Sequence, residues 1–355
     1  MSDPGASPYS RELQVAERAV HHAAILTKRV LSSVSEISKE DSSPVTVADF
    51  AAQALLTHLV RTEFPEDGFV GEEDSSALRR DEALSLRVYE LFASACRQLG
   101  GDASSVPSRN DMLDLIQIGG RSKGGSAEGR FWTMDPIDGT AAFLRGEQYA
   151  VSLALLQDGR EVLGVIACPN LKLQDGSIHE SCVDNDGLGV MLSAVRGQGT
   201  SLIALSSSPD DPLVPRRLER LQAPASLDRL HIVDCAIGAS SGRDVMRRLA
   251  ASLGAPFPGT DVWSSHVRYA ALAIGGGHVL VRIPSSPEDS SCIWDHAGAQ
   301  LIFTEMGGRV TDLDGKAMDF TAGRHLSRNR GLVAAHADIH DKMLSLVQNL
   351  ARQQL

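Results

Sequence analysis

The sequence lacks the features that mark membrane, secreted and disulfide-linked proteins. No apolar run reaches the ~20 residues that a membrane-spanning helix requires. Residues 1–10 show no apolar core behind a basic segment, so we expect no secretory signal. The five cysteines are scattered without a CxxC pair, which is typical of thiols in a reducing compartment. These absences together predict a cytoplasmic protein with no membrane partner.

The chain is also short of basic residues. Its 34 lysines and arginines face 45 aspartates and glutamates, which gives a net charge of −11. A general nucleic-acid-binding protein needs a basic surface, so we predict no nucleic-acid partner. A small anionic substrate remains compatible with this charge, because bound metal ions reverse the field of an acidic site.

The first part of the chain is expected to combine helices with strands. Apolar residues recur at helical spacing over residues 11–32 and 48–63. The stretch 100–129 is rich in glycine, serine and charge, with one amphipathic piece around residues 112–118, and we predict a mobile surface excursion there. The glycine content of residues 119–129 would permit closure over a site, but the sequence does not decide whether this occurs.

The organisation changes near residue 225. Hairpins are predicted before that point, at 151–167 and 188–205, and a polar connection at 206–224. After it, strands and helices alternate at 231–236, 243–253, 278–283, 295–306, 311–314 and 331–335. We therefore predict an α/β fold with an α+β first half, divided into an N-terminal domain, 1–225, and a C-terminal domain, 226–355.

Two acidic clusters stand far apart in the chain and are interpreted as two halves of one metal site. The first holds Asp135 and Asp138, where an apolar stretch ends before a predicted helix. The second holds Asp295, at the start of another predicted helix. Hard divalent cations need several oxygen ligands, and a helix start supplies N–H groups for an anion. The two clusters therefore point to metal-dependent phosphate chemistry.

Three neighbours support the metal hypothesis for the first cluster, although Asp135 and Asp138 alone are also typical of a turn. Ile137 can offer a backbone carbonyl between the two carboxylates. Gly139 lets the chain approach a ligand closely. Thr140 places a hydroxyl at the start of a helix.

Other acidic residues have a plain structural alternative. Glu72 belongs to a run of three acids, which is usually a solvated surface. Asp49 either complements a helix dipole or acts with Thr140 on an attacking water. Asp295 is either a metal ligand or a helix N-cap, and the adjoining His296 is expected to be structural.

With their surroundings, these residues resemble one superfamily, the lithium-sensitive, magnesium-dependent phosphatases that include inositol monophosphatase. The matching segments are SPVTVAD (43–49), GEEDS (71–75), WTMDPIDGT (132–140), FLRGEQYAV (143–151) and IWDHAG (293–298). Segments 143–151, 164–170 and 194–199 look more like the 3′(2′),5′-bisphosphate nucleotidase branch. The resemblance covers residues 10–345 and implies a layered α/β/α/β/α sandwich.

The resemblance also implies roles, residue by residue. It implies two to three Mg²⁺ ions per active site, held by Glu72, Asp135, the Ile137 carbonyl, Asp138 and Asp295. Asp49 and Thr140 resemble the pair that activates the water, and no phosphoenzyme is expected. The implied substrate-binding residues are Gly139, Thr140, Ser240, Ser265, Arg268 and Arg282.

The nucleotide end departs from the family pattern. Ala239 stands where the branch has a histidine, and Arg268 stands where it has a lysine. Arg282 matches the family's arginine, and arginine can bind phosphate bidentately. His266 is one candidate to replace the missing imidazole, but we expect a surface histidine without a role in binding.

The resemblance thus implies a magnesium-dependent phosphomonoesterase. The expected substrate is adenosine 3′,5′-bisphosphate, from which the 3′-phosphate is removed, with the 5′-phosphosulfate as a second candidate. One alternative keeps the chemistry but acts on an inositol phosphate, a sugar phosphate or a specialised-pathway phosphate ester. Another is an inactive relative that binds a ligand as a sensor. Lithium at millimolar concentration should inhibit the enzyme.

Overall fold

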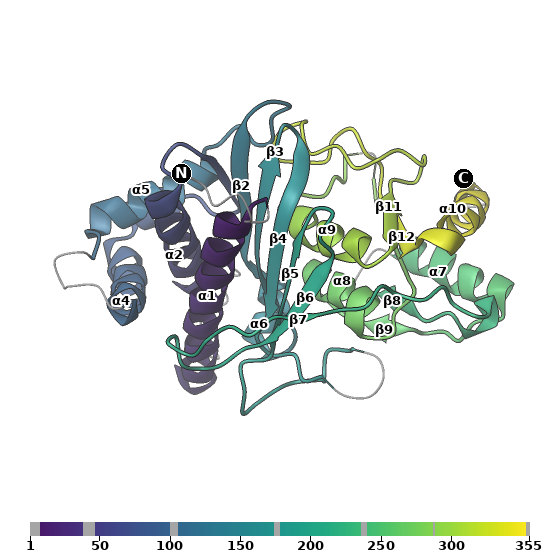
Figure 1. Cartoon of the computed structure of the whole chain (residues 1–355), viewed down its shortest axis with the longest axis horizontal. Helices are drawn as coiled ribbons and strands as arrows, with labels where there is room; N and C mark the ends of the chain where they lie inside the picture. Colours follow the sequence, from purple (N-terminus) through teal and green to yellow (C-terminus); the bar gives the residue numbers. More distant parts are fainter. Residues whose placement is uncertain are drawn as a thin grey trace.

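The computed structural model describes residues 8–37, 47–99, 106–173, 178–235, 240–286 and 288–352, with backbone alone at 32–37, 240 and 241. Helices and sheets alternate in five layers, from helices at the N-terminal end to helices at the C-terminal end (Figure 1). The predicted layered α/β/α/β/α sandwich is confirmed. Segments 38–46 and 236–239 of the chain lie outside the described residues. They include most of the SPVTVAD segment and Ala239.

The first sheet has seven strands in the order β1 to β7, and all neighbours except the parallel pair β1–β2 are antiparallel. Its strands are β1 (Gly68–Gly71), β2 (Arg130–Asp138), β3 (Ala150–Gln157), β4 (Arg160–Cys168), β5 (Val190–Val195), β6 (Thr200–Ala204) and β7 (Arg216–Arg217). Strands β2 to β5 are buried along almost their whole length because helices cover both faces of the sheet.

The outer helices on this sheet are α1 (Ser10–Ile37), α2 (Val47–Glu63), α4 (Glu82–Gln98) and α5 (Arg109–Gly120). Short helices α3 (Ser76–Arg80) and α6 (Thr140–Leu144) connect elements near its edges.

The prediction of a mobile surface excursion over 100–129 is wrong for the residues of helix α5. Ser108 and Asp111 form a capping box at its start, and its apolar residues are buried against α2 and β1. Residues 121–125 then pass along 320–324, where Gly125 pairs with Gly323.

The second sheet has five strands in the order β11-β12-β10-β8-β9 and mixes parallel with antiparallel pairs. Its strands are β8 (Ile232–Asp234), β9 (Thr260–Asp261), β10 (Val279–Arg282), β11 (Gly308–Thr311) and β12 (Leu332–His336). Strand β11 lies just before the strand predicted at 311–314. Residues 312–316 instead form a turn, in which the backbone N–H groups of Asp314 and Lys316 donate to the Asp312 carboxylate.

Helices α8 (Ser265–Ile274) and α9 (Ala297–Glu305) lie between the two sheets, and α7 (Ser240–Leu253) and α10 (Ala337–Arg352) cover the outer face of the second (Figure 1). A short 3₁₀ turn, η2 (Leu227–Arg229), precedes β8. Helix α9 sits directly on β4. A Cβ atom at Gly164 would lie 2.4 Å from the Gly298 carbonyl oxygen, so only glycine permits this approach. The contact brings the chain just before α9 to the end of β2.

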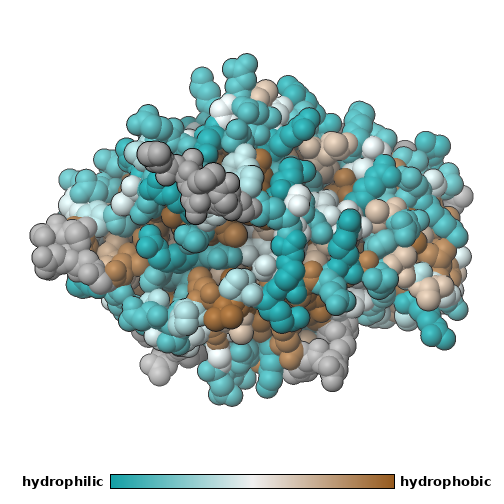
Figure 2. Space-filling view, in the orientation of Figure 1, coloured by the Kyte–Doolittle hydropathy of each residue, from teal (hydrophilic) through white to brown (hydrophobic). Residues whose placement is uncertain are grey.

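Hydrophilic residues cover most of the face seen in Figure 2. Among the described helices, none combines the length and apolarity that crossing a membrane would take.

The predicted division of the chain at residue 225 falls between the last strand of the first sheet and the first strand of the second. It stays a prediction as a boundary between domains.

Candidate metal centre and substrate pocket

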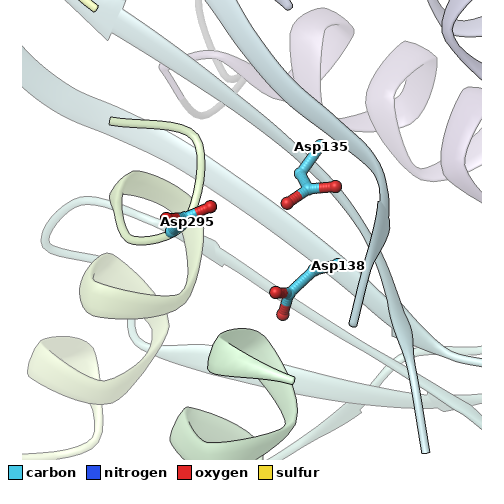
Figure 3. A group of neighbouring side chains, drawn as sticks. All are labelled: Asp135, Asp138 and Asp295. Carbon is cyan, nitrogen blue, oxygen red and sulfur yellow. The ribbon is translucent and has the colours of Figure 1, made fainter. Parts of the chain in front are cut away.

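The two acidic clusters meet where β2 ends and α9 begins. Asp135 and Asp138 lie on β2 itself rather than after it, because the strand continues through a bulge between them. Carboxylate oxygens of Asp135, Asp138 and Asp295 all lie within 4.8 Å of one another. Figure 3 shows the three side chains converging, two from the strand and one from the turn that enters α9. The bulge is what lets both strand aspartates face the same space.

The start of α8 fixes the position of Asp138. Ser264, the N-cap of α8, donates a hydrogen bond from Oγ to Asp138 Oδ2 at 2.5 Å, and the His266 backbone N–H donates to the same oxygen at 2.6 Å. Gly139 makes this approach possible, since its φ is 92° and a Cβ there would lie 3.1 Å from Ser264 Cβ. The glycine therefore serves the packing of α8 against the acidic turn.

His266 has a different role from the expected one, and the prediction of a surface histidine is wrong. Its side chain is fully buried, and its Nε2 lies 2.9 Å from the Trp294 carbonyl oxygen. One residue thus contacts Asp138 through its backbone and the residue before Asp295 through its ring. His266 ties the two acidic clusters together. The sequence signal that could have found it is its place two residues after an N-cap serine.

Arg324 connects the end of β1, which is followed by Glu72, to the chain that precedes Asp295. Its guanidinium donates to the Gly71 carbonyl at 2.7 Å and to the Glu72 carbonyl at 3.3 Å. It also lies over the Trp294 ring, 4.5 Å from the ring centre. The end of β1 is thereby held against the chain before Asp295. Sequence reasoning missed Arg324, because nothing in its neighbourhood indicates these distant partners.

The carboxylates at this place are crowded. Loss of hydration, then repulsion by neighbouring acids, raises the pKa of Glu72 and of Asp295 to about 7 each. The same causes raise the pKa of Asp135 well above its usual range. A cluster of like charges made only of oxygen ligands is the donor set that a hard divalent cation requires. The residues present therefore fit a cation such as Mg²⁺, with Asp135, Asp138 and Asp295 as its ligands and Glu72 beside them.

The two residues predicted to activate water come from the first turns of two different helices. Asp49 is buried in the first turn of α2, and its charge contributes to the raised pKa of Glu72. Thr140 begins α6 and lines the pocket, and its hydroxyl donates to the Ile137 carbonyl at 3.1 Å. Their joint action on a water stays a prediction.

The acidic cluster lines a cavity of about 590 Å³. Glu72, Ile137, Gly139 and Thr140 line it together with the three clustered aspartates. The C-terminal half of the chain adds the arginines Arg243, Arg268 and Arg282, with the carboxylates of Asp234 and Asp289 among them. We call the clustered carboxylates the acidic end of the pocket and the three arginines its basic end. Of the predicted substrate-binding residues, Gly139, Thr140, Ser265, Arg268 and Arg282 line it; Ser240 lies in α7, and its side chain is not described.

Comparison with known proteins agrees with this geometry. Residues 10–352 match the model of the inositol monophosphatase family. The chain belongs to this family. It is 38% identical to a 3′(2′),5′-bisphosphate nucleotidase of Emericella nidulans, over 97% of this chain and 99% of that protein. It is 35% identical to a protein of the same name from Oryza sativa, over 100% of this chain and 98% of that protein.

Solved structures of the family show the same fold. An IMPase of Thermotoga maritima superposes with a TM-score of 0.60 at 19% identity, covering 97% of this chain and 99% of the other. The extragenic suppressor protein suhB of Bartonella henselae gives 0.60 at 20% identity, covering 96% and 99%. At these identities the likeness shows the fold alone. Members of the inositol monophosphatase family are metal-dependent, in agreement with the acidic cluster of this one.

Within this family member, the predicted phosphate-binding arginines already have partners. Arg282 forms an ion pair with Asp289 at 2.5 Å, and Asp289 also accepts the backbone N–H of Ser285 at 2.8 Å. Arg268 donates to Ser265 Oγ at 2.9 Å. A phosphate reaching Arg282 must therefore share it with, or take it from, the Asp289 carboxylate.

Proposed function

We propose that the protein is a magnesium-dependent phosphomonoesterase that removes the 3′-phosphate of adenosine 3′,5′-bisphosphate. The observation that carries this proposal is that clustered carboxylates and three arginines line one pocket. A substrate with two phosphates matches this lining, because the carboxylates would hold a cation beside one phosphate and the arginines would bind the other. Relatives 35–38% identical over nearly the whole chain bear the corresponding name.

The chain's residues divide the work of hydrolysis. Asp135, Asp138 and Asp295 would hold a divalent cation, which would lower the pKa of a water and neutralise charge on the leaving oxygen. The Thr140 hydroxyl donates a hydrogen bond to the Ile137 carbonyl. The lone pairs of its Oγ1 can therefore accept a hydrogen bond from the attacking water. Asp49 is the carboxylate that takes up the water's proton. No side chain forms a bond to phosphorus.

The arginine end orients the substrate for this attack. Binding the phosphate that is not hydrolysed holds the ester phosphate at the acidic end, and holding reactants in place lowers the barrier. The 5′-phosphosulfate analogue carries its charge at the same end and is a second candidate substrate. Two or three Mg²⁺ per site, sensitivity to lithium and a cytoplasmic location stay predictions.

Two alternatives remain as competitors for the test. A phosphatase for inositol or sugar phosphates would use the same acidic end, and it would not need the nucleoside. An inactive relative would be expected to lose at least one of the acids or Thr140. Asp49, Glu72, Asp135, Asp138 and Asp295 are all present.

The test is release of inorganic phosphate from adenosine 3′,5′-bisphosphate and from inositol 1,4-bisphosphate, each with Mg²⁺ and with chelator. We expect Mg²⁺-dependent release that is much faster from the nucleotide. Release from the inositol compound alone would move the protein to the first alternative. Absence of turnover on both substrates, and on a broad panel of phosphate esters, would favour the sensor.

A further inference from the structure

The basic end of the pocket holds an arginine that was not among the predicted substrate-binding residues. Arg243 lies in the first turn of α7 and lines the cavity together with Gly242 and Met246. Arg268 and Arg282, which the family resemblance had singled out, line the same cavity from α8 and β10. Three elements of the C-terminal half thus each contribute a guanidinium.

Arg243 differs from the other two in its hydrogen bonding. Arg282 is held by Asp289, and Arg268 donates to Ser265. The carboxylate paired with Arg243 is that of Asp261, at 3.7 Å, which is too long for a hydrogen bond. Within the described ranges the Arg243 guanidinium makes no hydrogen bond, so its N–H groups are available to a ligand.

The Arg243 side chain is nevertheless held in place. Its guanidinium lies over the Phe257 ring, 5.8 Å from the ring centre, and near the Asp261 carboxylate. A cation over an aromatic face keeps its plane and position while its edge stays free. About a third of the side chain is solvent-exposed, so a ligand entering the pocket can reach it.

The ligand chemistry that suits this residue is a phosphate. A planar fork of N–H donors binds phosphate oxygens bidentately. A phosphate at Arg282 competes with Asp289, whereas Arg243 has no hydrogen bond to give up. Asp234 also lines this end, and its Oδ2 is buried without a hydrogen-bond partner. As an acceptor, it suits a hydroxyl or amino group of a nucleoside rather than a phosphate.

We propose that Arg243 binds the second phosphate of the substrate, the 5′-phosphate, while the 3′-phosphate lies at the acidic end. This inference rests on the proposed function. It makes Arg243 a specificity-determining residue, which separates substrates with two phosphates from those with one.

The test compares adenosine 3′,5′-bisphosphate with adenosine 3′-monophosphate, which lacks the group that Arg243 would bind. We expect Arg243→Ala to lower the ratio of kcat/KM for the bisphosphate over that for the monophosphate by about tenfold or more. Arg243→Lys should recover part of the ratio, because the ammonium keeps the charge without the fork. Arg247→Ala is the matched control; Arg247 lies one turn further along α7, is two-thirds exposed and pairs with Asp244.

Two outcomes would overturn the inference: a ratio in Arg243→Ala within twofold of wild type, or equal slowing of both substrates. Thermal unfolding of each variant shows that the fold is kept. Wild-type protein is measured first. If it hydrolyses neither nucleotide, the proposed function fails; if it hydrolyses the bisphosphate and only the Arg243 ratio is unchanged, this inference alone fails.

Discussion

The acidic end of the pocket and its basic end are built in opposite ways. At the acidic end, the carboxylate of Asp138 accepts hydrogen bonds from Ser264 and His266, and backbone contacts of Arg324 hold the end of β1. At the basic end, Arg243, Arg268 and Arg282 are long, partly exposed side chains with one or two partners each. The difference teaches that the chemistry depends on rigid packing, whereas substrate choice depends on side chains that can change without disturbing the fold.

The largest effect is expected from Asp138→Asn, which breaks the acidic end. The change removes a charge and no volume, and Asn Oδ1 can still accept the His266 N–H. Turnover should fall by about three orders of magnitude or more, because the metal loses a charged ligand. Steady-state kinetics measures the loss, and circular dichroism should show an intact fold. Asp114→Asn, on the surface and paired with Arg79, is the control; wild-type activity in Asp138→Asn would refute the metal assignment.

A second large effect should follow from Gly164→Ala, which acts on the acidic end from a distance. The new Cβ would lie 2.4 Å from the Gly298 carbonyl oxygen and would push α9, and with it Asp295, away from β2. We expect a loss of about 1–3 kcal/mol in unfolding free energy together with reduced kcat. Urea denaturation and kinetics measure both. Gly242→Ala in α7, where the nearest atom to a Cβ lies 3.8 Å away, is the control for stability; a Gly164→Ala protein as stable as the Gly242→Ala protein would contradict the account.

A moderate effect is expected of pH on the metal-free protein. The pKa of Glu72 and of Asp295 is about 7 in the folded chain, above the ordinary carboxylate range, so the folded state binds more protons than the unfolded state between about pH 4 and 7. Stability should therefore fall as the pH rises from about 4 to about 7 and level off above that. Mg²⁺ should raise the melting temperature more at pH 8 than at pH 5, because it binds the ionised carboxylates. Calorimetry in chelator and in Mg²⁺ tests this; a metal-free protein that is most stable at pH 8 would contradict it.

The smallest effect is expected at the basic end, from Asp289→Asn. Loss of the carboxylate frees Arg282 and removes a charge that opposes the substrate phosphate. KM for adenosine 3′,5′-bisphosphate should fall about two- to fivefold, with kcat nearly unchanged, since a partly exposed pair contributes little. A change in kcat larger than the change in KM would place Asp289 in the chemistry rather than in binding.

The two ends also differ in how far the sequence predicts them. Asp135, Asp138 and Asp295 could be found because carboxylates where apolar segments end are local signals, whereas the metal role of Glu72 was implied by the family resemblance. The pattern of helices and strands predicted an α/β fold with an α+β first half, and the resemblance implied the five-layer sandwich. What the residues themselves predicted depends on short-range pattern, which a sequence displays directly.

Features that depend on distant partners could not be predicted. Arg324 meets Gly71 and Trp294, and His266 meets Asp138, across long separations in the chain. Gly164 is needed only because Gly298 packs on it. Arg243 is one of many surface arginines until α7 places it in the pocket. Tertiary packing creates each of these roles.

The most direct test of the central claim is the position of the phosphate that leaves. Wild-type protein with Mg²⁺ is given adenosine 3′,5′-bisphosphate, and the product is identified by phosphorus NMR and chromatography. If the acidic end takes the 3′-phosphate and the arginines keep the 5′-phosphate, the product is adenosine 5′-monophosphate. Formation of adenosine 3′-monophosphate would mean that the substrate binds the other way round, and would contradict the account.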